Sequence, residues 1–434
     1  MVMAFVKSAV LVCLNVVLTV YLPRLWTTKR PVITGGTVQA GFEPVAKLFR
    51  ENFENGVEFS TGGSAYAVYY KGTKVVDIWG GYADSEANRP WKEDTLSVLF
   101  STTKGITSLC MLVLIDRGLI DLETTVASYW PEFAQNGKEN VTVRMLLNHQ
   151  AGLSYTSEKV TLALLEDQDA LGEVLARAPL VWQPGTAHGY HSMTFGLYAS
   201  QLLRRVDLKR RTLGQFFKEE IAQPCDLDVH IGLPLESFHR VARPTGNAVN
   251  VALALLYGLT TSPVNRQLLW AMFFGETDLP QIIESSGDTV EFSAYQRPET
   301  LALEQPSVFG VGTARAVAKV YGILANGGRT NDGHRLLSSD IIDRIISEAN
   351  SDGSRDRTVG IVTVLNFGYF IGEFQGSPQF GHSGGGSVQG LADPQQKLGM
   401  SYVSSYSSIF SLTDDPRFTS LQEETYKCIK EPES

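Results

Sequence analysis

The sequence predicts an α+β fold, in which an antiparallel sheet is flanked by helices and accompanied by an all-helical region. Two observations lead to this prediction. After about residue 43 a helical pattern is followed by β-rich segments, and the chain closes with β-rich segments followed by a helical pattern. The stretch of roughly 125–330 is richer in helical patterns. We therefore expect one sheet of about five to seven strands built from both ends of the chain, with the terminal helices on one face and the helical region on the other.

The composition is that of a globular chain with a large core. Of 434 residues, 43% are hydrophobic and 19% are charged, unlike a disordered or fibrous protein. The net charge of −9 excludes a strongly basic nucleic-acid binder, so we expect no nucleic-acid partner. The length fits two or three domains, or one large enzyme-like domain carrying insertions.

Residues 1–30 form a separate hydrophobic segment. An uncharged run from Ser8 to Leu22 is followed by basic residues, which is typical of a targeting or anchoring segment. We expect a single-pass transmembrane signal-anchor or a secretory signal, with membrane association through residues 4–22. A mitochondrial presequence is the alternative, because no acidic residue precedes Glu43.

The elements of the folded part follow in order. The segment EPVAKLFRENF, from Glu43, has helical spacing, and GGSAYAVYYKGTKVVDIWGGYAD predicts a hairpin that turns at residues 71–74. The middle region contains the helical patterns LALLEDQDALGEVLARA and ARAVAKVYGILANGG. Near the C-terminus FGYFIGEF, SVQGLADP and KLGMSYVSS predict strands, and RFTSLQEETYKCIKE predicts the last helix.

Ser101 and Lys104 are the first candidates for chemistry. FSTTKG leads into ITSLCMLVLIDRGLIDL, a segment apolar nearly all round and therefore a buried helix. Residues three apart share a helix face, so the two side chains meet. A serine hydroxyl becomes nucleophilic when a neighbour takes its proton, and burial lets a lysine do so by lowering its pKa. Because S-x-x-K arises by chance about once in such a chain, a helix cap is the alternative role for Ser101.

The order of motifs resembles the superfamily of serine β-lactamases (class C-like), penicillin-binding proteins and family VIII carboxylesterases. The matching segments are FSTTKG with its helix, IDRGLIDLETTVASYWPEF, VTVRMLLNHQAGL, QPGTAHGYHSMTFGLYASQLLRRV and GHSGGG at 381–386. The resemblance covers most of residues 43–410. It implies a β-lactamase/transpeptidase-like fold and a catalytic domain over 31–434, with no metal or organic cofactor. Its α/β part would be 43–124 and 331–434, and its helical part about 125–330.

The resemblance also implies roles for particular residues. Tyr190 would relay protons, since a phenol beside a lysine ammonium is shifted toward phenolate. Ser192 stands where asparagine is usual and would donate a hydrogen bond to Lys104 or to substrate. The backbone N–H groups of Ser101 and Gly385 would form the oxyanion hole. Whether Lys104 or Tyr190 is the general base stays open. The substrate-binding and oxyanion site would comprise Ser192, His382, Ser383, Gly384 and Gly385.

The remaining histidines and the cysteines have different expected roles. His382 bears on the substrate class. His382 replaces the lysine of K-T-G, which disfavours a β-lactam bearing a carboxylate. Its alternatives are a cap on the strand or a contact with Tyr190. We expect a structural role for His149, with its ring bonded to nearby backbone, and a spectator role for His191. The cysteines lie too far apart for a disulfide framework, at Cys13, Cys110, Cys225 and Cys428.

The sequence therefore predicts a serine hydrolase, carboxylesterase or peptidase-like, that forms an acyl-enzyme on Ser101. Its substrate would be a small-molecule or peptide ester, lactone or amide, with ester hydrolysis favoured over β-lactam hydrolysis. No deacylation element of the class A type is discernible in the sequence. The alternatives are a non-catalytic or self-assembling scaffold that keeps the fold, and hence a homo-oligomer, and a binding module that is acylated without turnover.

Overall fold

The computed structural model describes residues 30–59, 61–245, 266–267, 270–271, 277–349, 351–406 and 415–430. The expected anchor at residues 1–30 lies almost entirely outside them. Among the described residues no helix is both long and apolar enough to cross a membrane.

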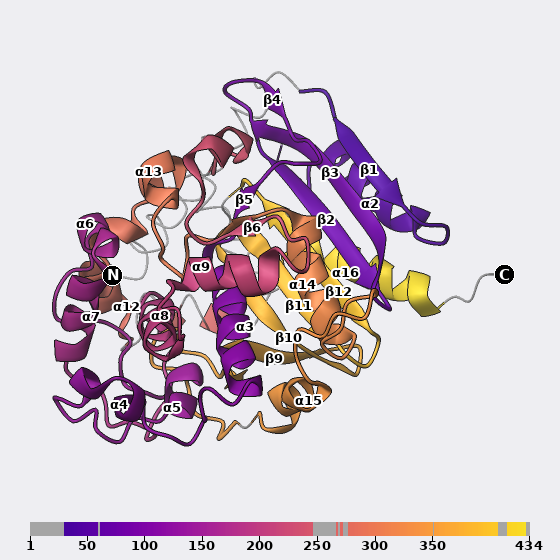
Figure 1. Cartoon of the computed structure of the whole chain (residues 1–434). Helices are drawn as coiled ribbons and strands as arrows, with labels where there is room; N and C mark the ends of the chain where they lie inside the picture. The colour runs from indigo at the N-terminus through magenta and orange to yellow at the C-terminus, as the bar shows by residue number, and fades with distance from the viewer. Residues whose placement is uncertain are drawn as a thin grey trace, which may run out of the picture.

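The central element is a sheet of nine strands in which all the pairings are antiparallel. The strand order is β1-β3-β2-β12-β11-β10-β9-β8, and β4 pairs with β3 (Figure 1). The strands are β1 (Thr34–Val38), β2 (Gly63–Tyr70), β3 (Thr73–Asp84), β4 (Arg89–Pro90), β8 (Leu365–Asn366), β9 (Tyr369–Phe374), β10 (Ser377–Gly384), β11 (Val388–Asp393) and β12 (Leu398–Ser404).

The sheet has more strands than the expected five to seven. The sequence TGGTV of β1 has a single aliphatic residue, and β4 and β8 are two residues long. None of these strands is long or apolar enough to give a periodic signal, and each forms by pairing with a longer neighbour.

The predicted hairpin and the joining of the two chain ends are confirmed. In the turn between β2 and β3, Lys71 and Gly72 both have positive φ, +49° and +77°, as a two-residue hairpin of type I′ requires. Strand β2 then pairs with β12, with Tyr66 opposite Tyr402, so the N-terminal and C-terminal strands form one sheet.

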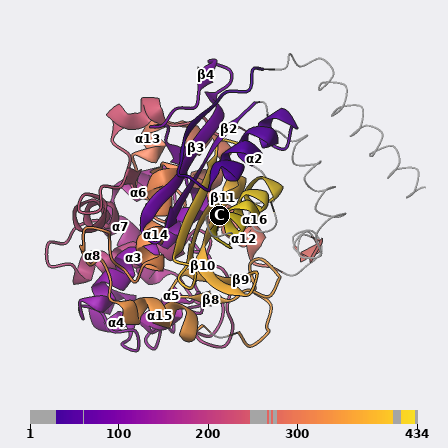
Figure 2. The same ribbon diagram turned by 90° about the vertical axis from the view of Figure 1, so that its right-hand side faces the viewer.

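Helices cover both faces of the sheet. Helices α2 (Glu43–Glu54) and α16 (Pro416–Lys430) share a buried apolar cluster with Tyr66 and Val68 of β2. Helices α3 (Thr103–Asp116) and α14 (Ala314–Ala325) share the other cluster with Ala65 and Ala67. The alternation along β2 is the period of two that a sheet buried on both faces requires. Figure 2 shows α2 and α16 on one side of the sheet and α14 and α3 on the other.

The helical region lies beyond α3 (Figure 1). The predicted helix over 162–178 is divided in two because Asp167 caps the second part, its carboxylate accepting from the N–H groups of Asp169 and Ala170. The helices are α4 (Val126–Tyr129), α5 (Val143–Leu147), α6 (Leu162–Glu166), α7 (Gln168–Arg177), α8 (Phe195–Val206), α9 (Leu213–Phe217), α12 (Leu279–Ser285) and α13 (Pro298–Leu301).

Further short elements complete the fold. Helix α15 spans Ser339–Ser347, and a second sheet has the order β5-β7-β6, from Ser97–Val98, Val311–Gly312 and Val229–His230. The short 3₁₀ segments are η1 (Phe100–Thr102), η2 (Pro131–Phe133), η4 (Leu235–Arg240), η5 (Gly287–Val290), η6 (Phe292–Gln296) and η7 (Gly385–Ser387), and η3 (Lys218–Ala222) is a π-helix.

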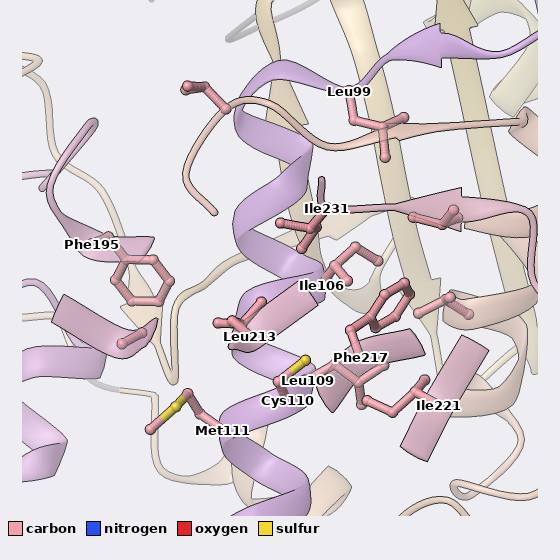
Figure 3. Close-up of a cluster of buried hydrophobic side chains, with 14 of the residues drawn as sticks. Leu99, Ile106, Leu109, Cys110, Met111, Phe195, Leu213, Phe217, Ile221 and Ile231 are labelled. Atoms are coloured by element: carbon pink, nitrogen blue, oxygen red, sulfur yellow. The ribbon is translucent and has the colours of Figure 1, made fainter. Parts of the chain in front are cut away.

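Helix α3 is buried over most of its length, as its composition predicts. Residues 103–114 are all buried, and Ile106, Leu109 and Cys110 contribute to the apolar cluster of Figure 3 together with residues from α9 and η3. Burial also raises the pKa of the Cys110 thiol, so this cysteine is a core side chain without nucleophilic character. The helix is thus held rigidly between the sheet and the helical region, with Ser101 just before its N-terminal end.

Candidate active site

Ser101 and Lys104 meet as their spacing predicts. Ser101 lies in η1, which runs directly into α3. The Lys104 Nζ is 3.0 Å from the Ser101 Oγ and 3.0 Å from the carbonyl oxygen of Ser307. Neither η1 nor α3 has a side-chain N-cap, so the alternative role of Ser101 as a helix cap is wrong. The serine hydroxyl faces the lysine instead.

The environment of Lys104 favours the neutral amine. Its side chain is completely buried, and burial lowers its pKa well below the usual range. A neutral amine has a lone pair, and the Ser307 carbonyl can accept one of its protons. The lone pair is then available to the hydroxyl proton of Ser101, which is the state that a general base requires.

The hydroxyl of Tyr190 also belongs to this cluster. The Tyr190 ring centroid is 4.8 Å from the Lys104 Nζ, and the Ser101 side chain is near enough to act on the pKa of the Tyr190 hydroxyl. Burial raises the pKa of Tyr190, so the expected shift toward phenolate is wrong. The physical reason is desolvation, which disfavours the charged phenolate. The same burial favours the neutral form of Lys104 and so weakens the cation that would stabilise a phenolate. Tyr190 therefore holds its proton and can donate it.

His382, on β10, contacts Tyr190. Its Nε2 lies 3.4 Å from the Tyr190 hydroxyl, and its Nδ1 lies 2.7 Å from the carbonyl oxygen of Ser383. Because a carbonyl only accepts, this contact places the proton on Nδ1 and leaves Nε2 as an acceptor for Tyr190. Burial lowers the pKa of His382 well below its usual range and favours the neutral ring. The ring of Phe370 lies beside both, 5.6 Å from Tyr190 and 5.0 Å from His382.

The glycines after His382 lie against the turn that carries Ser101. A Cβ at Gly384 would be 2.4 Å from the carbonyl oxygen of Leu99, and one at Gly385 would be 3.2 Å from the Phe100 ring. The Thr102 hydroxyl ties the two segments together through the carbonyl oxygen of His382. Absence of side chains is what permits this close approach of backbone to the site.

Two other predicted residues contribute less than expected. The Ser383 hydroxyl donates to Gln389 Oε1 at 2.6 Å, so this side chain is engaged by the neighbouring strand. Ser192 is half-buried and follows Tyr190 in a tight turn, its N–H donating to the Tyr190 carbonyl. Within the described part of the chain its hydroxyl makes no hydrogen bond to Lys104, and the Ser307 carbonyl takes that position.

The predicted structural role of His149 agrees with the geometry, and His191, expected to be a spectator, also binds backbone. The backbone N–H of His191 donates to His149 Nδ1 at 2.9 Å, and that of Leu153 donates to His191 Nε2 at 3.0 Å. Burial lowers the pKa of His149 well below the usual range and that of His191 to about 4. These neutral rings fix the backbone on either side of Tyr190.

Sequence reasoning missed two residues that support the site. Ser307 supplies its carbonyl to Lys104, while its hydroxyl donates to the Met193 carbonyl at 2.9 Å. Asp356 is buried and accepts from the backbone N–H of Tyr190. Neither lies in a recognisable motif. Among the residues that the structure describes, no group of three or more His, Cys, Asp or Glu side chains could hold a metal ion.

Comparison with known proteins identifies the fold and the family. The family model named Beta-lactamase matches residues 49–422. The chain belongs to the β-lactamase family. The esterase/beta-lactamase LipL of Mycobacterium tuberculosis is 36% identical over 379 residues, which cover 85% of this chain and 82% of that protein. The family members to which it is similar make this chain a serine hydrolase.

Solved structures of the family share the whole fold. A family VIII carboxylesterase superposes with a TM-score of 0.77 at 34% identity, covering 91% of this chain and 100% of that one. A penicillin-binding protein homologue from Caulobacter crescentus superposes with a TM-score of 0.75 at 32% identity, again over 91% of this chain and 100% of the other. The predicted β-lactamase/transpeptidase-like fold is therefore confirmed.

Proposed function

We propose that this β-lactamase-family hydrolase cleaves carboxylic esters by transferring their acyl group to Ser101. The observation that carries the proposal is the contact between the Ser101 hydroxyl and the neutral, fully buried amine of Lys104. A nucleophilic serine needs a base that is unprotonated at neutral pH, and burial shifts this lysine toward that state.

In the acylation step the Lys104 amine takes the proton of Ser101 as its Oγ bonds to the ester carbonyl carbon. The carbonyl oxygen becomes an oxyanion, and the backbone N–H groups of Ser101 and Gly385 stabilise it. When the tetrahedral intermediate collapses, the bond to the leaving oxygen breaks. Tyr190, which keeps its proton, donates to that oxygen and is reprotonated by the Lys104 ammonium.

In the deacylation step a water molecule takes the place of the alcohol. Lys104 accepts a water proton as the hydroxide oxygen bonds to the acyl carbon, and the bond to Ser101 Oγ breaks. The proton returns to Ser101, and the carboxylic acid leaves. The same groups therefore serve both steps in reverse order.

Ester substrates are favoured by the charge of the site. By its place in the motif, His382 replaces the lysine that would pair with a substrate carboxylate, and burial favours its neutral form. A carboxylate-bearing β-lactam would lose that ion pair, whereas an uncharged ester loses nothing. Two similar proteins, an esterase/beta-lactamase and a family VIII carboxylesterase, agree with this preference.

The proposal is tested with the full chain, as wild type and as Ser101→Ala and Tyr190→Phe. Each is mixed with a fluorophosphonate probe and with p-nitrophenyl butyrate, and intact mass and released nitrophenol are recorded. We expect one label and steady turnover in the wild type, neither in Ser101→Ala, and slower turnover in Tyr190→Phe. Equal behaviour of wild type and Ser101→Ala would contradict the proposal and favour a non-catalytic scaffold.

A further inference from the structure

A buried ion pair at the start of α16 lies against η7, the turn that begins with the proposed oxyanion glycine, Gly385. Arg417 and Asp415 are each 2% exposed. The guanidinium contacts both carboxylate oxygens, with Nε 3.0 Å from Oδ1 and Nη2 2.8 Å from Oδ2. A bidentate pair of this kind holds both side chains in one orientation.

Both members of this pair bind the turn η7 through Ser387. The Ser387 hydroxyl donates to Asp415 Oδ2 and accepts from Arg417 Nη2 at 2.9 Å. Arg417 Nη2 also lies 3.4 Å from the carbonyl oxygen of Gly386. The C-terminal helix thus holds the turn between β10 and β11 by a side chain and by the backbone.

The turn needs such support because its backbone is unfavourable. Gly386 and Ser387 have φ of +76° and +67°, both in the left-handed region. Glycine adopts this conformation freely, but a serine does so at an energetic cost and stays there only when its surroundings hold it. The two hydrogen bonds to the Ser387 hydroxyl provide that restraint.

Arg417 is itself fixed on every side. Its guanidinium lies 5.6 Å from the ring of Phe59 and 5.8 Å from that of Tyr402, and Nη1 donates to Ser404 at 3.3 Å. The nearby carboxyl of Glu58 is fully buried and accepts from the Tyr402 hydroxyl at 2.5 Å. Desolvation raises the pKa of Glu58 and favours its neutral form, whereas the pKa of Asp415 is lowered. Asp415 is therefore the anionic partner of Arg417.

We propose that Arg417 and Asp415, acting through Ser387, are positioning residues that aim the Gly385 N–H into the oxyanion hole. Gly385 is the first residue of this turn, and a Cβ on it would lie 3.2 Å from the ring of Phe100, the residue before Ser101. Rotation of the turn would rotate the peptide that carries this N–H. This inference rests on the proposed function, since an oxyanion forms only if Ser101 attacks a carbonyl.

The decisive variant is Ser387→Ala, which removes the hydroxyl between the ion pair and the turn. Its matched control is Ser377→Ala, because Ser377 is equally buried at the start of β10 and donates to the carboxylate of Asp393 at 2.8 Å. We expect kcat for p-nitrophenyl butyrate to fall roughly 10-fold to 100-fold in Ser387→Ala, with KM changed less than about twofold. The control should keep the wild-type kcat.

A second readout is specific to the oxyanion hole. The wild type should prefer an ester to the matching thionoester, because sulfur is a larger and weaker acceptor for the hole's N–H groups. Ser387→Ala should reduce this preference, whereas a merely structural defect would slow both substrates equally. Arg417→Lys keeps the charge but loses the bidentate geometry, so it should fall between wild type and Ser387→Ala in both readouts.

The outcomes separate the two proposals. A wild type without Ser101-dependent turnover overturns the proposed function and this inference with it. A wild type that turns over while Ser387→Ala matches Ser377→Ala overturns the inference alone. The inference is also overturned if the loss of kcat in Ser387→Ala is no larger than the loss of folded protein measured by thermal unfolding. If Ser387→Ala does not fold, Arg417→Lys decides by the same two readouts.

Discussion

Asp356 holds Tyr190 by its backbone. Both carboxylate oxygens of Asp356 accept from the Tyr190 N–H, at 3.1 and 2.9 Å, across a sequence separation of 166 residues. The same carboxylate accepts from the N–H groups of Thr358 and Val359. Asp356 thus joins the segment after α15 to the loop before α8. By fixing the backbone of Tyr190, it also fixes the place from which the Tyr190 side chain reaches the site.

Replacing Asp356 by asparagine should separate Tyr190 from this support. An amide offers one accepting oxygen, and its NH₂ group would face backbone N–H groups that need acceptors. We expect about 1–3 kcal/mol lower stability to denaturant and roughly 10-fold lower kcat. Asp352→Asn is the control, since Asp352 is exposed in the same segment. Equal kcat in the two variants would show that the support is unnecessary.

The pH dependence of kcat/KM should identify the base. Burial lowers the pKa of Lys104 well below 10.5 and raises that of Tyr190 above 10.0. If Lys104 is the base, activity rises with pH through its lowered pKa, because only the neutral amine accepts the Ser101 proton. We expect this acid limb in the wild type and, at lower rates, in Tyr190→Phe.

An acid limb that disappears in Tyr190→Phe, or one that lies near 10.5, would contradict this assignment. The profile is measured with an ester that does not titrate in the range. Lys104→Arg is the complementary variant, since a guanidinium cannot lose its proton, and its rate should fall by about 10² to 10⁴ without recovering at high pH.

The sequence predicts most reliably the parts of the site that are local. Ser101 and Lys104 meet because they are three residues apart and so lie on the same face of one helical turn. The apolar composition of α3 predicts the burial that favours the neutral amine. The Ser307 carbonyl could not be predicted, because every residue has a carbonyl and this one lies 203 residues from Lys104.

The errors have physical reasons as well. The charge argument for Tyr190 assumed a lysine ammonium, although the burial inferred for the same helix implies a neutral amine. The sheet is wider than expected because β4 and β8 are held by pairing alone. The glycines of GHSGGG were assigned by resemblance, but the support of their turn by Arg417 depends on tertiary contacts that no local pattern contains.

Because α14 lies very close to strand β12 of the sheet, adding a side chain at Gly399 should destabilise the fold. A Cβ at Gly399 of β12 would lie 2.0 Å from the backbone nitrogen of Gly322 on α14, and backbone cannot move aside as a side chain can. We expect Gly399→Ala to lower the free energy of unfolding by about 3 kcal/mol. Gly372→Ala is the control, because a Cβ there meets no atom within 4 Å. Equal denaturation midpoints for the two would contradict the observed packing.

Acid should destabilise the fold through the buried histidines. Burial lowers the pKa of His191 from 6.5 to about 4, so the unfolded chain binds a proton in this range that the folded chain does not. The contribution of neutral His191 to the free energy of unfolding is therefore complete above pH 6.5. It is lost as the pH falls toward 4, and the total loss is about 3 kcal/mol. His149 and His382, whose pKa values are also lowered, act with the same sign.

Two buried carboxyls oppose this effect, because the raised pKa values of Glu58 and Glu304 favour the folded state as the pH falls. The slope of unfolding free energy against pH must therefore be compared between variants. His191→Asn should flatten it below pH 6 by up to about 1.4 kcal/mol per pH unit, the value for one proton. His334→Asn, which changes an exposed histidine, should leave it unchanged. Parallel slopes for wild type and His191→Asn would mean that His191 takes up no proton on unfolding.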